Sequence, residues 1–231
     1  MINSYIITIE GNKLSEEGAR VCKKSTPNNI RPHIFEAVTP DQVDDFMKKH
    51  LLEWNYPWQG EQLDFKSGLK KSAYPTNNPK KRIACFLSHY ILWKKCASGT
   101  KPMIIQEHDS VWKPRVVFNE SIFDYSLFNI IGLNDPRGAT RKANVYHDEV
   151  QAQEGEIVSA PKIDSYEIPQ GIAGNSSYYM KPSGAKRMIQ LVDEYGAWPN
   201  DAIMCRQLVQ TLGQTKNYYT QVQGLQSTTT L

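Results

Sequence analysis

Short runs of β-branched and aromatic residues alternate along the chain with longer segments that have helical spacing. The first run, residues 5–9, is followed by a polar break and then by residues 15–24, where carboxylates come first and lysines last, as in a helix. A second run at residues 34–38 precedes another helical segment at residues 40–50. This β-α-β-α order predicts an α/β fold, with a mostly parallel central sheet and flanking helices.

The same kind of pattern continues toward the C-terminus. Further helices are expected at residues 83–95, 183–195 and 201–211, and further buried strands at residues 103–106, 128–133 and 176–180. Between them lie an aromatic loop at residues 53–80 and a polar stretch at residues 134–165, which we interpret as a loop or hairpin. The length of 231 residues suits a single domain, which we place at residues 1–225, before a polar tail at residues 226–231.

Composition narrows the classes of function. Hydrophobic residues make up 40% of the chain and aromatic residues 10%, enough to build a core, so a mainly disordered chain is excluded. The 27 basic and 24 acidic residues leave a net charge of +3, which is too small to indicate binding of nucleic acid. The N-terminus reads as a strand and the apolar runs are short, so neither a signal peptide nor a transmembrane segment is expected. A substrate at a membrane surface stays open.

The four cysteines are scattered and show no C-x-x-C spacing, which excludes a zinc ribbon or a thioredoxin motif. They are Cys22, Cys85, Cys96 and Cys205. Cysteines inside apolar helical segments behave as small hydrophobic residues. We therefore expect reduced thiols, and with them a cytoplasmic protein.

Two carboxylates follow the strand at residues 103–106. Glu107 and Asp109 are two positions apart, and side chains at that spacing point to the same face of a strand. In α/β sheets, ligands bind at the carboxyl ends of the strands. Two hard oxygen donors at such a place suit Mg²⁺ or Mn²⁺ holding a diphosphate. A solvated turn with charged residues is the alternative.

Three other segments carry candidate chemistry, each with a structural alternative. His89 lies in an apolar helical segment, where a histidine is commonly a structural hydrogen-bonding group. Gly174 and Asn175 belong to a small-residue stretch that either lets a ligand approach the backbone or forms a tight loop. Asp201 is either a helix N-cap or a general base.

These segments occur in an order that carries a family resemblance. The matching parts are residues 85–93, 105–109, 171–174 and 183–185, together with Pro199 and Asp201. In this order they resemble glycosyltransferase family 25, the group that includes lipooligosaccharide and collagen galactosyltransferases, and the resemblance covers most of residues 4–205. Two positions depart from the family pattern: Ala84 stands in place of a glycine and His108 in place of an aspartate.

The resemblance implies a GT-A-like single domain that binds a nucleotide sugar. It further implies an inverting transfer of a hexose, with UDP-galactose or UDP-glucose as the first choice of donor, to a hydroxyl group of a glycan or other acceptor. Lipopolysaccharide biosynthesis is the corresponding process. The bound cation would be Mn²⁺ or Mg²⁺.

The resemblance also suggests roles for individual residues. Glu107 and Asp109 would hold the metal, and Asp201 would accept the proton of the acceptor hydroxyl or else orient a donor sugar hydroxyl. The donor contacts would come from Thr8, Glu10, Asn12, His89, His108, Gly174 and Asn175. The aromatic loop would bind the acceptor through Trp54, Tyr56, Trp58 and Tyr74, whose rings could stack on sugar faces. The same aromatic residues could equally form a hydrophobic cluster under the loop.

Several alternatives stay open. The altered acidic motif at His108 leaves room for a catalytically inactive family member that binds glycans or a partner protein. A nucleotidyltransferase is disfavoured, because residues 10–13 match a glycine-rich phosphate loop poorly. The basic run at residues 80–82 either meets an anionic acceptor or forms a solvated face at a helix start.

Overall fold

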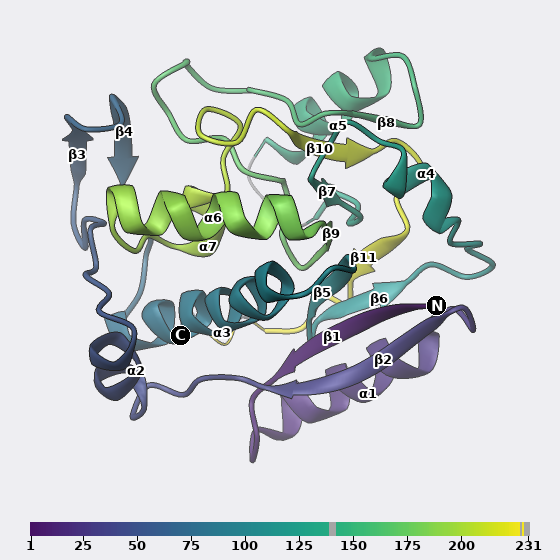
Figure 1. Ribbon diagram of the computed structural model, residues 1–231, viewed down its shortest axis with the longest axis horizontal. Helices are drawn as coiled ribbons and strands as arrows, with labels where there is room; N and C mark the ends of the chain where they lie inside the picture. The colour runs from purple at the N-terminus through teal and green to yellow at the C-terminus, as the bar shows by residue number, and fades with distance from the viewer. Residues whose placement is uncertain (139–141, 227, 229–231) are drawn as a thin grey trace.

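The computed structural model describes residues 1–138, 142–226 and 228, and a central sheet with helices on both faces organises the molecule (Figure 1). Within these residues the sheet has seven strands in the order β2-β1-β5-β9-β7-β10-β8. The strands are β1 (Ile2–Thr8), β2 (Ile30–Glu36), β5 (Met103–Glu107), β7 (Ile130–Gly132), β8 (Ile157–Ser159), β9 (Ser177–Met180) and β10 (Leu212–Thr215). Only β9 and β8 run against the other five described strands, which confirms the predicted α/β fold with a mostly parallel sheet.

One face of the sheet is covered by α3 (Pro79–Ser98), α6 (Pro182–Tyr195) and the short α7 (Asn200–Ile203). Helices α3 and α6 lie side by side (Figure 1), and α2 (Val43–Lys49) packs against α3. Helix α3 begins where the side chain of Asn78 accepts the N–H of Lys80, a standard N-cap arrangement, with Pro79 as the first helical residue. This side of the sheet holds the larger core cluster, to which α3 contributes Trp93.

The opposite face carries α1 (Lys13–Ser25), α4 (Glu120–Asp124) and a ribbon of β6 (Ser110–Trp112) and β11 (Thr220–Val222). Successive strand residues point to opposite faces. Ile105 and Tyr178 therefore join the core under α3, while their neighbours Ile104 and Tyr179 join a second core cluster with Phe123 of α4. Both layers are apolar, as expected for a buried sheet.

The helix predicted at residues 201–211 is wrong beyond its first turn. Helix α7 ends at Ile203, and the chain then pairs with the loop before β9 through a bridge between Gly171 and Cys205. The N–H of Arg206 donates to the carbonyl oxygen of Gln170 at 2.7 Å. These tertiary hydrogen bonds take the place of helical ones.

Two stretches interpreted as loops contain regular structure. Residues 134–165 include α5 (Ala143–Ala152), which buries Tyr146 and Val150, and the edge strand β8. The aromatic loop at residues 53–80 includes a hairpin of β3 (Glu61–Asp64) and β4 (Leu69–Ser72). Their polar composition hid these elements, because only one side of each is buried.

The segment after β11 crosses the end of β5. The backbone N–H of Gln223 donates to the carbonyl oxygen of Asp109, and its side-chain amide donates to the carbonyl oxygens of His108 and Ser110. Residues 227 and 229–231 of the predicted polar tail lie outside the described residues. None of the helices in the described part of the chain combines the length and apolar character needed to cross a membrane.

Candidate active site

Glu107 is the last residue of β5, and His108 and Asp109 form the turn that leads into β6. Since the strand stops at Glu107, the strand alternation expected from the sequence is not what brings the two carboxylates together. Both nevertheless line one cavity of about 580 Å³, here called the carboxylate cavity. Its other described lining residues include Arg82, Gly174, Asn175, Ser176 and Asp201.

The loop that precedes β9 forms one wall of this cavity. Gly174 has a φ of 67°, and the N–H of Glu107 donates to the carbonyl oxygen of Ser176 at 2.8 Å, which ties the loop to the end of β5. Asn175 is 9% exposed, and neither polar atom of its amide has a hydrogen-bond partner among the described residues. A buried amide is costly unless a ligand or water satisfies it, so Asn175 is a candidate ligand contact.

His89, which lies in α3, forms a hydrogen bond with Glu107. The imidazole is buried, with Nε2 3.2 Å from Glu107 Oε1 and Nδ1 2.8 Å from the hydroxyl of Tyr178. The indole N–H of Trp93 donates to the same hydroxyl at 2.8 Å. The helix motif noted in the sequence therefore reaches the acidic strand end through a chain of buried hydrogen bonds.

The two carboxylates differ in their electrostatics. Burial is the largest single influence on Glu107 and opposes its ionisation, but the hydrogen bond from His89 and the nearby side chains of His89, His108 and Arg82 together outweigh it and hold the pKa of Glu107 below its usual value. Burial, together with the negative charge of Glu107, raises the pKa of Asp109 to about 7. Asp109 Oδ1 is also buried without a hydrogen-bond partner among the described residues. Two close carboxylates with an unpaired oxygen fit a divalent cation, because its charge removes their repulsion.

A second group of possible metal ligands shares Glu107. The ligand atoms of Cys85, His89 and Glu107 lie within 4.8 Å of one another. His89 already holds Glu107 and Tyr178 through its two ring nitrogens. Burial raises the pKa of the Cys85 thiol well above its usual value, which keeps it protonated and a poor ligand. The carboxylate pair therefore remains the candidate for holding a cation, and its oxygen donors would suit Mn²⁺ or Mg²⁺.

Asp201 lies in α7 and lines the carboxylate cavity together with Glu107 and Asp109. Its side chain is half-buried, and the protein packed around it, with the charge of Glu107, raises the pKa of this carboxyl; Arg82 opposes the shift. Gly171 lies directly against it, because a Cβ at that position would overlap the backbone carbonyl oxygen of Asp201. The small-residue stretch thus serves to position Asp201.

A neighbouring cavity of about 380 Å³, here called the apolar cavity, shares Cys85, Glu107 and His108 with the carboxylate cavity. Its apolar lining comes from Ile7, Ile9, Leu14, Ala37, Val38, Pro40 and Ala84. Asn12 and His89 also line it, and Asn12 Oδ1 accepts the N–H of Ser15 as the N-cap of α1.

Two of the predicted donor contacts lie away from this cavity. Ile7 and Ile9 face it, so strand alternation turns Thr8 to the other side, where its hydroxyl donates to the carbonyl oxygen of Ile6 at 3.1 Å. Glu10 lies in the exposed turn that follows and is not among the lining residues. A donor role for either one stays a prediction that the geometry does not support.

A third cavity of about 570 Å³, here called the tyrosine cavity, meets the carboxylate cavity at Ile172 and Asp201. Tyr56 lines it, beside Tyr74. Other described lining residues are Glu61, Lys70, Tyr146, Asp164, Gln170 and Gly171.

Trp54 and Trp58 lie elsewhere. Their rings stack on each other with centroids 5.1 Å apart, and neither belongs to the described lining of the tyrosine cavity. Trp54 lines a separate cavity beside the end of α6. Of the predicted acceptor contacts, Tyr56 and Tyr74 line the cavity that Asp201 also lines, and Trp54 and Trp58 do not.

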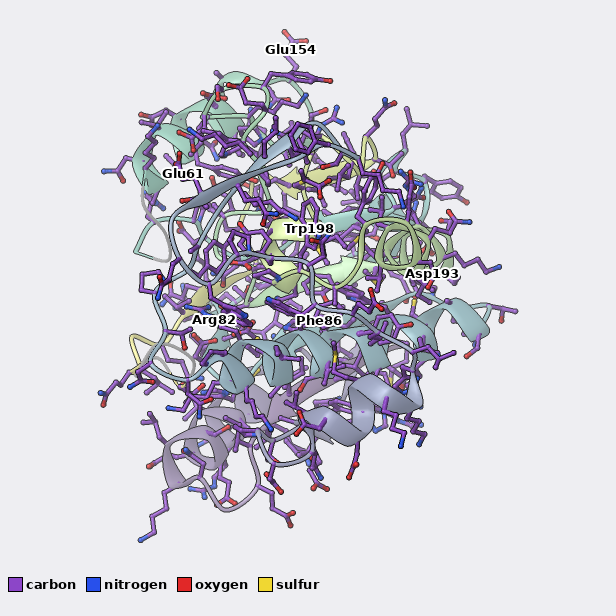
Figure 2. All side chains as sticks on the ribbon, turned by 90° about the vertical axis from the view of Figure 1, so that its left-hand side faces the viewer. Glu61, Arg82, Phe86, Glu154, Asp193 and Trp198 are labelled. Carbon is purple, nitrogen blue, oxygen red and sulfur yellow. The ribbon has the colours of Figure 1, made fainter. Side chains whose placement is uncertain are left out.

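Sequence reasoning missed two functional candidates. Arg82 lines the carboxylate cavity, with its guanidinium 5.3 Å from the ring centre of Tyr74. For the basic run as a whole, the sequence had left open an anionic acceptor or a solvated face, without singling out Arg82. Figure 2 shows Arg82 at one end of α3, with Phe86 farther along the same helix. Tyr178 was read only as a strand residue. Helical spacing could have flagged Arg82, since consecutive residues of a helix point about 100° apart.

Comparison with known proteins identifies one matching protein family and a similar solved structure. Residues 1–204 match the model of glycosyltransferase family 25, described as an LPS biosynthesis protein. A search among curated proteins finds no match. Among solved structures, the chain is similar to mouse xyloside xylosyltransferase 1 in its apo form, with 10% sequence identity and a TM-score of 0.38 over 88% of this chain and 67% of that one.

Proposed function

Because the chain belongs to glycosyltransferase family 25 and is a glycosyltransferase, we propose that it transfers a hexose from a nucleotide sugar to a hydroxyl group of a glycan. The proposed donors are UDP-galactose and UDP-glucose, and the proposed cation is Mn²⁺ or Mg²⁺. The proposed setting is lipopolysaccharide assembly in the cytoplasm. One observation carries the proposal. The carboxylate cavity is lined by Glu107, Asp109 and Asp201 and shares lining residues with both the apolar cavity and the tyrosine cavity.

The apolar cavity suits the nucleoside of the donor. Its volume lies within the range of roughly 300–1,000 Å³ that is usual for ligand sites, and its apolar walls suit a flat base. The diphosphate would then extend past His108 into the carboxylate cavity. Glu107 and Asp109 would hold the cation there, which when bound neutralises the charge of the departing diphosphate.

Arg82 supplies a second positive charge in that cavity. The guanidinium of Arg82 packs over the Tyr74 ring, and its Nη2 donates to the carbonyl oxygen of Pro75 at 3.3 Å. A guanidinium matches the geometry of phosphate oxygens. Gly174 and the unpaired amide of Asn175 would contact the donor sugar.

Asp201 is the proposed general base. The acceptor oxygen forms a bond to the anomeric carbon while the bond from that carbon to the diphosphate oxygen breaks. The electron pair leaves with the nucleoside diphosphate, and the acceptor proton passes to the Asp201 carboxylate. Its raised pKa favours this step, because a base works best when its pKa is near the working pH. Attack opposite to the leaving group inverts the anomeric configuration.

Product analysis of wild-type protein and Asp201→Asn tests the reaction. With UDP-galactose or UDP-glucose, Mn²⁺ and a glycoside acceptor, NMR of the product should show inverted configuration at the anomeric carbon. Asp201→Asn should lose about 10²–10⁴-fold in transfer rate while still binding UDP. Retained configuration, or full transfer by Asp201→Asn, would contradict the assigned mechanism.

A further inference from the structure

Gln223 follows β11 and holds the turn that carries Asp109. Its backbone N–H donates to the carbonyl oxygen of Asp109 at 2.7 Å, and its side-chain amide nitrogen lies 3.0 Å from the carbonyl oxygen of His108 and 2.9 Å from that of Ser110. Because carbonyl oxygens can only accept, the nitrogen of the amide, and not its oxygen, must face them. One residue thus donates to three successive carbonyl oxygens, at positions 108–110.

Helix α1 contacts the same residue from the other side. The amide nitrogen of Gln223 also lies 3.0 Å from the carbonyl oxygen of Gly18, so its two hydrogens are shared among these acceptors. Gly18 is buried, and a Cβ there would lie 2.8 Å from the carbonyl oxygen of His108 and 2.7 Å from the Leu225 side chain. A glycine at this position therefore lets the helix, the turn and the segment after β11 pack closely.

Asp109 depends on this support more than Glu107 does. It lies in the turn between β5 and β6, so its position follows the backbone of that turn. Glu107 is held separately, by the hydrogen bond from its N–H to Ser176 and by His89. Two carboxylates that share one cation must keep their separation, because divalent cations bind oxygen donors only at about 2.0–2.6 Å. Gln223 thus acts on the carboxylate that His89 does not hold.

The segment after β11 also forms a wall of the proposed donor site. The carboxylate cavity is lined by Val222, Gly224, Leu225 and Gln226, and the last of these lines the apolar cavity as well. Strand β11 pairs with β6, directly after the Asp109 turn (Figure 1). Gln223 itself is not among the described lining residues of either cavity, so it acts through the turn and not on a ligand. It also lies beyond residues 1–204, which match the family model.

We propose that Gln223 is a positioning residue for the cation site, and that it holds Asp109 at the separation from Glu107 at which both carboxylates bind one ion. This inference rests on the proposed function. The N–H groups of Gln223 fix the carbonyl oxygens of the turn without touching the cation or the donor. Loss of these N–H groups lets the backbone at Asp109 shift, which weakens the cation site although both ligands remain.

Binding of Mn²⁺ to the full chain, followed by electron paramagnetic resonance, tests the proposal. Gln223→Met keeps the length of the side chain and removes its N–H donors, and Gln223→Glu places a carboxylate against the carbonyl oxygens of the turn. Each variant should lower the affinity for Mn²⁺ by about 10–100-fold, the usual effect of losing a residue that orients a metal ligand.

Gln153→Met is the matched control. Gln153 is half-buried like Gln223, and its amide donates to the carbonyl oxygens of Glu149 and Ser159 at 3.3 and 3.0 Å, outside the described lining of both cavities. This variant should bind Mn²⁺ as the wild type does. Thermal melting of each variant shows whether it is folded and how much stability it has lost.

Gly18→Ala tests the proposal from a second element. Its new methyl group would press on the carbonyl oxygen of His108, so it should also weaken Mn²⁺ binding. If the Gln223 variants do not fold, Gly18→Ala is the deciding variant, and unchanged affinity in it overturns the proposal.

The outcomes separate this inference from the proposed function. Wild-type affinity for Mn²⁺ in the folded Gln223 variants, or an equal loss in Gln153→Met, overturns the positioning role, while release of UDP by the wild type in Mn²⁺ still supports the proposed function. A wild type that neither binds Mn²⁺ nor releases UDP from any donor contradicts both.

Discussion

The imidazole Nε2 of His89 lies 3.2 Å from Glu107 Oε1 and carries the proton of that hydrogen bond. The assignment follows from the partners. The pKa of Glu107 is held low, so its carboxylate can only accept and Nε2 is the donor. In the neutral imidazole Nδ1 is then an acceptor and takes the Tyr178 hydroxyl proton, while the Tyr178 oxygen accepts the indole N–H of Trp93. The chain from Trp93 to Glu107 fixes the carboxylate that we assign to the cation.

Breaking this chain should weaken the cation site. Tyr178→Phe and His89→Ala should each lower the affinity for Mn²⁺ by about 10–100-fold, because the residues behind a metal ligand orient it. His89→Gln, which keeps a side-chain N–H, should recover part of the loss. Mn²⁺ titration followed by electron paramagnetic resonance measures these affinities.

His147→Ala is the matched control for these variants, because it removes another histidine–tyrosine hydrogen bond, the 2.9 Å contact with Tyr218, away from Glu107. Equal affinity for Mn²⁺ in Tyr178→Phe and wild type would show that Tyr178 does not position the ligand.

The ionised carboxylate of Asp109, proposed to bind the cation, should lower the thermal stability of the metal-free protein. This carboxylate is buried beside Glu107, and its pKa of about 7 means that at pH 8 the folded protein bears a charge repulsion that the unfolded chain lacks. Asp109→Asn should therefore raise Tm by about 2–4 °C without metal, and Mn²⁺ should no longer raise it further. Differential scanning calorimetry checks this against Asp193→Asn, an exposed carboxylate whose removal should leave Tm unchanged. A lower Tm in Asp109→Asn would argue against the repulsion.

Arg82 should contribute to binding of the diphosphate. Arg82→Gln is expected to weaken UDP binding in the presence of Mn²⁺ by about 10–30-fold, the usual effect of losing a hydrogen bond to a charged group. Calorimetric titration of UDP measures this change. Lys80→Gln is the control, because Lys80 pairs with Asp44 at 2.6 Å and does not line the cavity. The same dissociation constant in Arg82→Gln and Lys80→Gln would remove Arg82 from the site.

Two adjacent lysines of β4 should differ sharply in their effect on folding. The Lys71 side chain is fully buried and pairs with Asp64 at 3.1 Å, whereas Lys70 pairs with Glu61 at the surface. Lys71→Met should lower the free energy of unfolding by about 3–5 kcal/mol, because it leaves Asp64 buried without its counter-charge. Lys70→Met should cost less than about 1 kcal/mol. Urea unfolding measures both, and equal losses would show that the buried pair is unimportant.

The sequence predicted the parts of the fold that depend on local periodicity. The runs that became β1 and β5 and the apolar spacing of α3 each identified their element. The antiparallel insertion of β9 between β5 and β7 has no local signal, because it depends on pairing between residues far apart. The predicted helix at residues 201–211 was too long for the same reason, because pairing with Gly171 replaces the helical hydrogen bonds.

The candidate site residues at the end of one strand could be predicted from the sequence. Those on a helix could not, because helix geometry points consecutive residues in different directions. Glu107 and Asp109 were visible as a pair in the sequence. Lys80, Lys81 and Arg82 read as one basic run, yet the helix turns them apart. Lys80 reaches Asp44, Lys81 lines the apolar cavity and Arg82 the carboxylate cavity.

The central claim is that Glu107 and Asp109 hold a cation needed for transfer from a nucleotide sugar. The most direct test measures UDP release from UDP-galactose and UDP-glucose with a glycoside acceptor, in Mn²⁺ and in EDTA, for wild type and Asp109→Ala. We predict turnover of one donor by the wild type in Mn²⁺, with a loss of at least about 10²-fold in EDTA and in Asp109→Ala. Undiminished turnover in EDTA, or in Asp109→Ala, would contradict the account.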